Sequence, residues 1–95
     1  MVVGVAQITF KLFGISSLKG KRGIVRSMKA RLANHFNASV AETDRNDSLD
    51  WAVISLSMVG NDARTINAKL DHALNFADDL GLAVIADTRI EIIHL

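Results

Sequence analysis

Residues 2–13 read VVGVAQITFKLF, and the alternation of apolar and polar side chains in this run predicts a β-strand. Successive side chains of a strand point to opposite faces, so one face of this strand is expected to cover a hydrophobic core. The apolar face consists of Val2, Ala6, Ile8, Phe10 and Leu12. The opposite face carries Gln7, Thr9 and Lys11. The sequence GISS at 14–17 predicts a loop, and its serines are suited to cap a following helix.

The next segment, residues 18–36, has the pattern of an amphipathic helix. Apolar side chains recur there at three- and four-residue spacing, which predicts a buried stripe along one side of the helix. This stripe consists of Val25, Met28, Leu32 and Phe36. Two glycines, Gly20 and Gly23, weaken the first turns. We therefore expect the regular helix to begin near Lys21.

Three more strands and a second helix follow along the chain. The expected strands are residues 38–43, 51–59 and 82–95. A polar turn, DRNDSLD at 44–50, separates the second strand from the third. The second helix is expected to start at a cap formed by Asn61 or Asp62 and to end at Gly81. The order β-α-β-β-α-β predicts one ferredoxin-like α+β domain over residues 1–95, with a four-stranded antiparallel sheet and both helices on one face.

The composition limits the class of protein. Ninety-five residues suffice for one domain, and 49% of them are hydrophobic, which is ample for a core. The absence of cysteine excludes disulfides and thiolate chemistry. No apolar run approaches the ~20 residues that cross a bilayer, and the first strand lacks the basic start of a signal peptide. We therefore expect a cytoplasmic protein without a membrane contact.

The net charge of +1 conceals a strong asymmetry along the chain. Residues 1–41 hold seven Lys or Arg and no Asp or Glu, whereas residues 42–95 hold four Lys or Arg and ten Asp or Glu. The two parts therefore carry formal charges of +7 and −6. Such a division predicts a basic face that binds an anionic partner. A basic face that contacts only solvent is the alternative.

The basic residues are concentrated where the first strand passes into the first helix. Lys and Arg at a helix N-terminus oppose the helix dipole and cost a few tenths to about 1 kcal/mol each. Their presence beside free backbone N–H groups and two serine hydroxyls predicts an anion-binding site. The candidate residues are Ser16, Ser17, Lys19, Lys21, Arg22, Arg26 and Lys29.

Four of these cations lie on one side of the expected helix. On a helical wheel they form a row about 15 Å long, which is long enough to contact several phosphates of a nucleic acid. The row consists of Lys19, Arg22, Arg26 and Lys29. The structural alternative is that these cations pair with acidic side chains of the second helix, namely Asp71, Asp78 and Asp79.

The sheet face opposite the helices offers a second candidate surface. We expect Val5, Trp51 and Val53 to be exposed there among polar side chains. An exposed apolar patch usually marks an interface, so these residues favour a homodimer formed through the sheet face. Trp51, the only tryptophan, also suits base stacking. The structural alternative for Trp51 is an aromatic side chain that covers the edge of the core.

Four short pieces of the sequence carry a family resemblance. They are VGV at 3–5, SLKGKR at 17–22, FNASVAE at 36–42 and NDAR at 61–64. Together they resemble the YlxP-like family of small uncharacterised bacterial proteins, and the resemblance covers nearly the whole chain. It implies a ferredoxin-like fold. It also implies a setting among translation and ribosome-maturation factors, and hence a connection with RNA, but it supplies no catalytic residues.

Several patterns of catalysis and metal binding are not met. A phosphate-binding P-loop requires four residues between its glycines, but five separate Gly14 from Gly20. The three histidines lack the spacing of zinc ligands. An acylphosphatase-like enzyme would need a glycine-rich loop with a catalytic arginine, which the sequence does not have. We therefore expect no catalytic residues, no metal and no cofactor.

These observations favour a binding protein over an enzyme. We expect a non-enzymatic, RNA- or ribosome-associated accessory protein that binds phosphate backbone through its basic loop and first helix. The expected partner is ribosomal RNA or a ribosomal subunit. The alternative is a protein-interaction or self-assembly module that acts through the open sheet face.

Overall fold

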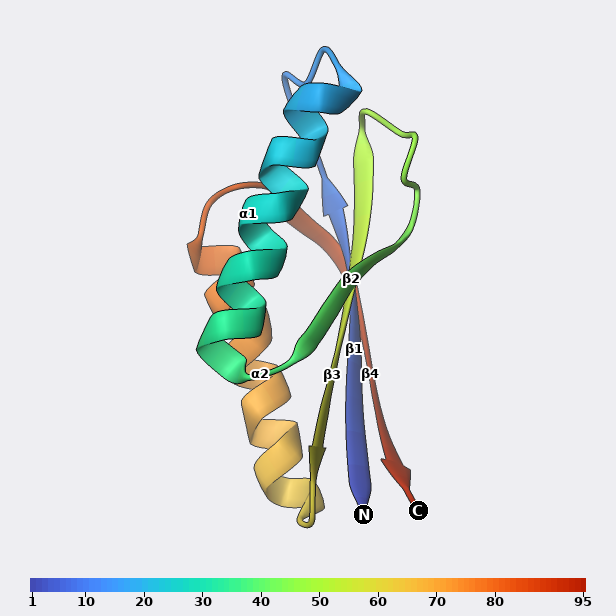
Figure 1. Cartoon of the computed structure of the whole chain (residues 1–95), viewed down its shortest axis with the longest axis vertical. Helices are drawn as coiled ribbons and strands as arrows, with labels where there is room; N and C mark the ends of the chain where they lie inside the picture. The colour runs from blue at the N-terminus through green and yellow to red at the C-terminus, as the bar shows by residue number, and fades with distance from the viewer.

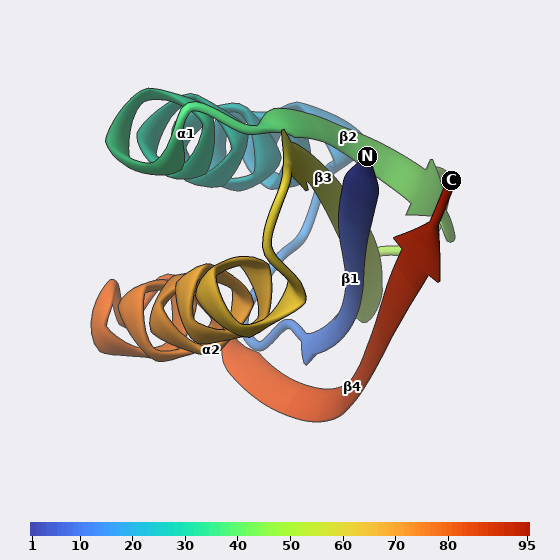
Figure 2. The same ribbon diagram turned by 90° about the horizontal axis from the view of Figure 1, so that it is seen from below.

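The computed structural model describes residues 1–95 and contains the six predicted elements in the predicted order. They are β1 (Val2–Lys11), α1 (Leu18–Phe36), β2 (Ser39–Asp44), β3 (Trp51–Gly60), α2 (Ala63–Asp79) and β4 (Val84–His94). The strands form one antiparallel sheet in the order β2-β3-β1-β4. Both helices cover the same face of this sheet, and the other face is open (Figures 1 and 2). The predicted ferredoxin-like α+β fold is confirmed.

The hydrophobic core lies between the helices and the sheet. As the alternation predicted, one face of each central strand is buried. The strands contribute Val2, Ala6, Ile8, Phe10, Ala52, Ile54, Leu56 and Met58. The helices contribute Val25, Met28, Leu32, Ile66, Leu70, Ala73 and Ala77. Because only one face of the sheet meets helices, the molecule has two layers and a single core.

The ends of the elements differ from the predicted ends by at most two residues, and α1 has both of its predicted ends, Leu18 and Phe36. Only the expectation that its regular turns begin near Lys21 was wrong, because the helix is regular from Leu18. Its N-cap is Ser17, whose Oγ accepts a hydrogen bond of 3.1 Å from the N–H of Gly20. This cap stabilises the first turn in spite of its glycine.

The cap of α2 is Asp62, one of the two predicted candidates. Its Oδ2 accepts hydrogen bonds from the Thr65 hydroxyl at 2.6 Å and from the Thr65 N–H at 3.1 Å. These bonds favour the ionised carboxylate, so they lower the pKa of Asp62 from its ordinary value of 3.8. The cap fixes where α2 begins above the sheet.

A glycine on the core face of β1 lets α2 approach the sheet closely. A Cβ atom at Gly4 would overlap Ile66 Cγ2 and would lie 2.9 Å from Leu70 Cδ1. Gly4 is paired with Met58 of β3 and with Ile92 of β4, so its backbone is held from both sides. The position of α2 on the sheet therefore depends on the missing side chain at residue 4.

We predict that Gly4→Ala destabilises the domain by about 1–3 kcal/mol, because the added methyl group overpacks the contact between α2 and β1. Urea unfolding followed by circular dichroism measures the loss. Gly23→Ala is the matched control, because a Cβ atom there meets nothing within 4 Å. Since Gly23 lies inside a helix, this control should raise stability by up to about 1 kcal/mol. Equal stability of the two variants would contradict the close packing at Gly4.

Candidate nucleic-acid interface

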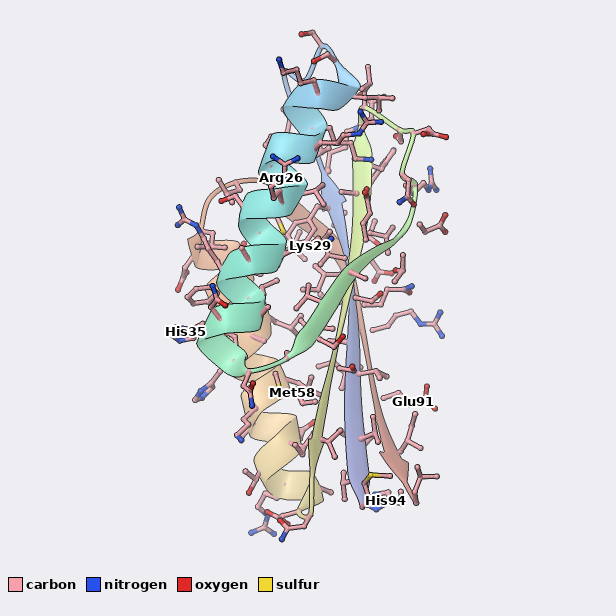
Figure 3. All side chains as sticks on the ribbon, viewed as in Figure 1. Arg26, Lys29, His35, Met58, Glu91 and His94 are labelled. Atoms are coloured by element: carbon pink, nitrogen blue, oxygen red, sulfur yellow. The ribbon has the colours of Figure 1, made fainter.

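The four predicted cations of α1 lie together on its accessible surface. Lys19, Arg22 and Arg26 are exposed, and Lys29 is half-buried. Figure 3 shows Arg26 and Lys29 on neighbouring turns of the helix. We call this set the α1 row; it consists of Lys19, Arg22, Arg26 and Lys29. The row follows the helix for about 15 Å at 1.5 Å per residue.

No acidic side chain neutralises the α1 row. The protein has one salt bridge, between Lys21 and Glu42, and neither residue belongs to the row. The proposed pairing of the row with Asp71, Asp78 or Asp79 of α2 is therefore absent. An unpaired row of cations produces a local positive potential, although the whole chain is nearly neutral.

A groove of about 310 Å³ runs between α1 and β2 beside the row. Three members of the row line it from the helix, namely Arg22, Arg26 and Lys29. Ala41 and Glu42 line it from β2, and Asn46 lines it from the turn that follows β2. A ligand that lay in this groove along the helix would thus meet three cations.

Lys21 does not belong to this surface, and its prediction as an exposed anion-binding cation was wrong. Its side chain is 1% exposed, and its ammonium lies 3.1 Å from Glu42 Oε2. The same Nζ donates hydrogen bonds to the backbone carbonyls of Arg45 at 2.5 Å and of Asn46 at 3.4 Å. Lys21 therefore ties α1 to β2 and to the turn between β2 and β3.

The burial of Lys21 follows from its place on the helix. It precedes Val25 by four residues and therefore continues the buried stripe of Val25, Met28 and Leu32 by one turn. Glu42 Oε2 is itself buried, and no hydrogen-bond donor meets it with good geometry. The Lys21 ammonium is the charge that compensates this oxygen.

We predict that Lys21→Ala destabilises the domain by about 3 kcal/mol, because it leaves a largely buried carboxylate without its cation. Urea unfolding of Lys21→Ala and of Arg22→Ala, its exposed neighbour, measures the difference. Arg22→Ala should change stability by less than about 0.5 kcal/mol. Equal effects of the two substitutions would show that Lys21 is not a structural cation.

The two predicted serines lie in the loop before α1, and both are exposed. The Ser17 hydroxyl oxygen is engaged as the helix cap, so its first role is structural. Ser16 makes no side-chain hydrogen bond and directly precedes the cap residue Ser17. The positive end of the helix dipole lies at this first turn, and no acidic residue of the turn neutralises it.

The second predicted surface, on the open sheet face, differs from the prediction in two places. Val53 is buried, at 6% exposure, so it was wrongly predicted to be exposed. Trp51 is half-buried, with Lys11 Nζ 4.6 Å and Arg45 Cζ 5.9 Å from the centre of its ring. Both cations lie within the range of a cation–π interaction with the ring. Val5 is half-buried and lines a shallow hollow of about 630 Å³ on this face.

The comparisons with known proteins agree with the observed fold. The family described as "Protein of unknown function (DUF503)" matches residues 3–90. The chain belongs to this family. A comparison with curated proteins gave no match.

Solved structures of the same architecture come from proteins with different names. The acylphosphatase from Bacillus subtilis has a TM-score of 0.58 and 10% identity, with 100% of this chain and 88% of that chain covered. A putative antibiotic biosynthesis monooxygenase from Chloroflexus aurantiacus has a TM-score of 0.56 and 12% identity, with 100% and 95% covered. The designed protein Foldit4 has a TM-score of 0.54 and 11% identity, with 99% and 97% covered. Such low identities show the fold alone.

Neither α1 nor α2 is both long and apolar enough to span a lipid bilayer. No three His, Asp or Glu side chains are gathered closely enough to hold a metal ion.

Proposed function

We propose that this protein is a non-enzymatic RNA-binding accessory protein, and that the α1 row binds the phosphate backbone of structured RNA. The observation that carries the proposal is the unpaired charge of the row beside a groove. Four cations on one face of one helix have no acidic partner, whereas the one buried cation of that helix does. Charges that the fold itself does not use are available to a partner.

The physical chemistry of the row suits a phosphate backbone better than a protein surface. Each phosphate that a Lys or Arg neutralises releases condensed counterions, which makes binding favourable and sensitive to salt. Lys19 stands in the first turn of α1, where a cation opposes the helix dipole and an acidic residue would be more stable. An anion bound at this end would meet both the dipole and the row.

The resemblance to the YlxP-like family suggests which RNA the row binds. That resemblance implies a setting of translation and ribosome maturation, where ribosomal RNA is the abundant structured RNA. We therefore propose ribosomal RNA or a ribosomal subunit as the partner and the cytoplasm as the compartment. This RNA is bound through its backbone, so the proposal requires no base-specific contact.

The triple variant Arg22→Ala, Arg26→Ala and Lys29→Ala tests the proposal. Lys21 is left intact, because its removal would destabilise the fold. We expect the triple variant to bind ribosomal RNA weakly. The magnitude of the slope of log affinity against log salt should fall by about 2–3, since each lost phosphate contact reduces that magnitude by slightly less than one. Filter binding over a series of salt concentrations measures the slope.

A matched triple variant controls for net charge. Arg31→Ala, Arg64→Ala and Lys69→Ala removes the same number of exposed cations, from outside the row. Arg31 lies on α1 but on a different side of the helix from the row. Its removal therefore tests whether the position of a cation on the helix matters, and not only its presence there. We expect this variant to keep the wild-type slope. If both triple variants bind like the wild type, the α1 row is not the RNA-binding surface.

A further inference from the structure

The strand β4 leaves one edge of the sheet uncovered. It is eleven residues long, nine of them are exposed, and it contacts only β1 beside it and α2 on the core face (Figure 2). The other edge strand, β2, has six residues and a bulge between Glu42 and Asp44. Short and bulged strands are common ways to protect an edge, as are Pro and Lys, and β4 contains neither of those residues.

Most of β4 is regular enough to pair with another strand. Residues 87–94 pair without interruption with residues 2–9 of β1, and the irregularity lies on the other side of Asp87, at Ala86. Two isoleucines on the helical side are incompletely covered: Ile90 is 38% exposed, and Ile92 is half-buried. The strand therefore offers free backbone groups and apolar side chains along the same edge.

The charges of β4 are arranged in alternating sign on the open face. Asp87, Arg89 and Glu91 share that face because they are two residues apart. Figure 3 shows Glu91 directed away from the helical layer. None of the three has a partner of opposite charge within 4 Å in the isolated chain, since the only salt bridge lies elsewhere.

We propose that β4 pairs antiparallel with β4 of a second copy of this chain, about a two-fold axis at Ile90. Such pairing joins the two sheets into one sheet of eight strands and closes the exposed edge. In this register Arg89 of each copy lies opposite Glu91 of the other, which gives two cross-strand ion pairs on the open face. On the helical side Ile90 meets its own copy, and Ile92 lies opposite Thr88 of the second copy.

The other symmetric registers are less favourable. Centred on Arg89, the pairing would place that arginine against itself and Asp87 against Glu91. Centred on Glu91, it would place two glutamates in contact. Like charges directly opposite each other destabilise a pair of strands. Centred on Thr88, the ladder would run into the irregularity at Ala86. The register at Ile90 is the one that joins regular backbone with opposite charges.

The assembly also has a consequence for the α1 row. The two-fold axis would stand perpendicular to the sheet, so the helical layers of both copies would lie on the same side. A dimer would then present two α1 rows on one side. Formation of the dimer does not require RNA, so it can be tested without RNA and independently of the proposed function.

Charge reversal tests the register. Arg89→Glu makes all three charged residues of the strand acidic, and Glu91→Arg places two arginines on its open face. We expect each variant alone to raise the dissociation constant of the dimer at least about tenfold. An equimolar mixture should restore the affinity, because each Glu then faces an Arg. Sedimentation velocity over the micromolar range measures all three samples; a wild type that stays monomeric, or single variants that dimerise like the wild type, would overturn the proposal.

Cross-linking distinguishes edge pairing from contact between open faces. The chain has no cysteine, so an introduced cysteine carries the only thiol of the molecule. Ile90→Cys should form a disulfide-linked dimer on mild oxidation, because the two residues lie opposite each other across the new ladder. Val59→Cys, at an exposed position on the open face, is the matched control and should form no disulfide-linked dimer under the same oxidising conditions. Cross-linking through Val59 and not through Ile90 would show that two copies associate through the open face and not through the β4 edge.

Discussion

The ion pair between Lys21 and Glu42 connects the basic helix to the sheet. A largely buried pair is favourable only when further hydrogen bonds satisfy its charges, and Lys21 donates two such bonds to the carbonyls of Arg45 and Asn46. The pair therefore fixes α1 against β2 and holds the turn after β2 in place. The groove beside the α1 row has its shape because these three segments are held together. One cation of the helix is used for structure, and its neighbours remain accessible.

Most of the fold could be predicted from the sequence because each element has a single buried face. In β1 and β3 every second residue is apolar and faces the core, and in α1 and α2 the apolar side chains recur at helical spacing. Local patterns of this kind survive folding when the tertiary structure agrees with them. The regular turns of α1 were expected to begin near Lys21 because Gly20 and Gly23 were given more weight than the serine cap, whose hydroxyl accepts a hydrogen bond from the N–H of Gly20. Side-chain caps of this kind act on a few residues only and can offset a poor helix propensity.

The candidate site was predicted less completely than the fold. The α1 row could be predicted because spacing along a helix determines which side chains share a side. The burial of Lys21 depends on Glu42, which lies twenty-one residues further along the chain and meets it only after the sheet has formed. The position of Lys21 four residues before Val25 was the local signal that it faces inward. Val53 was missed for a related reason: alternation assigns a side chain to a face, whereas the neighbouring strands on both sides decide how exposed it is.

The fold itself carries no information about activity, since proteins with different names share it at 10–12% identity. The functional account rests on the distribution of charge over this architecture. Four of the seven basic residues of the first part of the chain form the α1 row. The acidic residues of the second part lie on other elements, and none of them forms a salt bridge with the row. The α1 row therefore lies on a different surface from the open sheet face and from the free edge at β4.

The most direct measurement is a titration of the isotopically labelled protein with a fragment of structured ribosomal RNA, followed by the backbone amide resonances in NMR. The account predicts that the largest changes fall on residues 19–29 of α1 and on Ala41, Glu42 and Asn46 across the groove, and that they weaken as salt is added. Changes centred on Trp51 and the open sheet face, or no changes at low salt, would contradict the assignment of the α1 row as the RNA-binding surface.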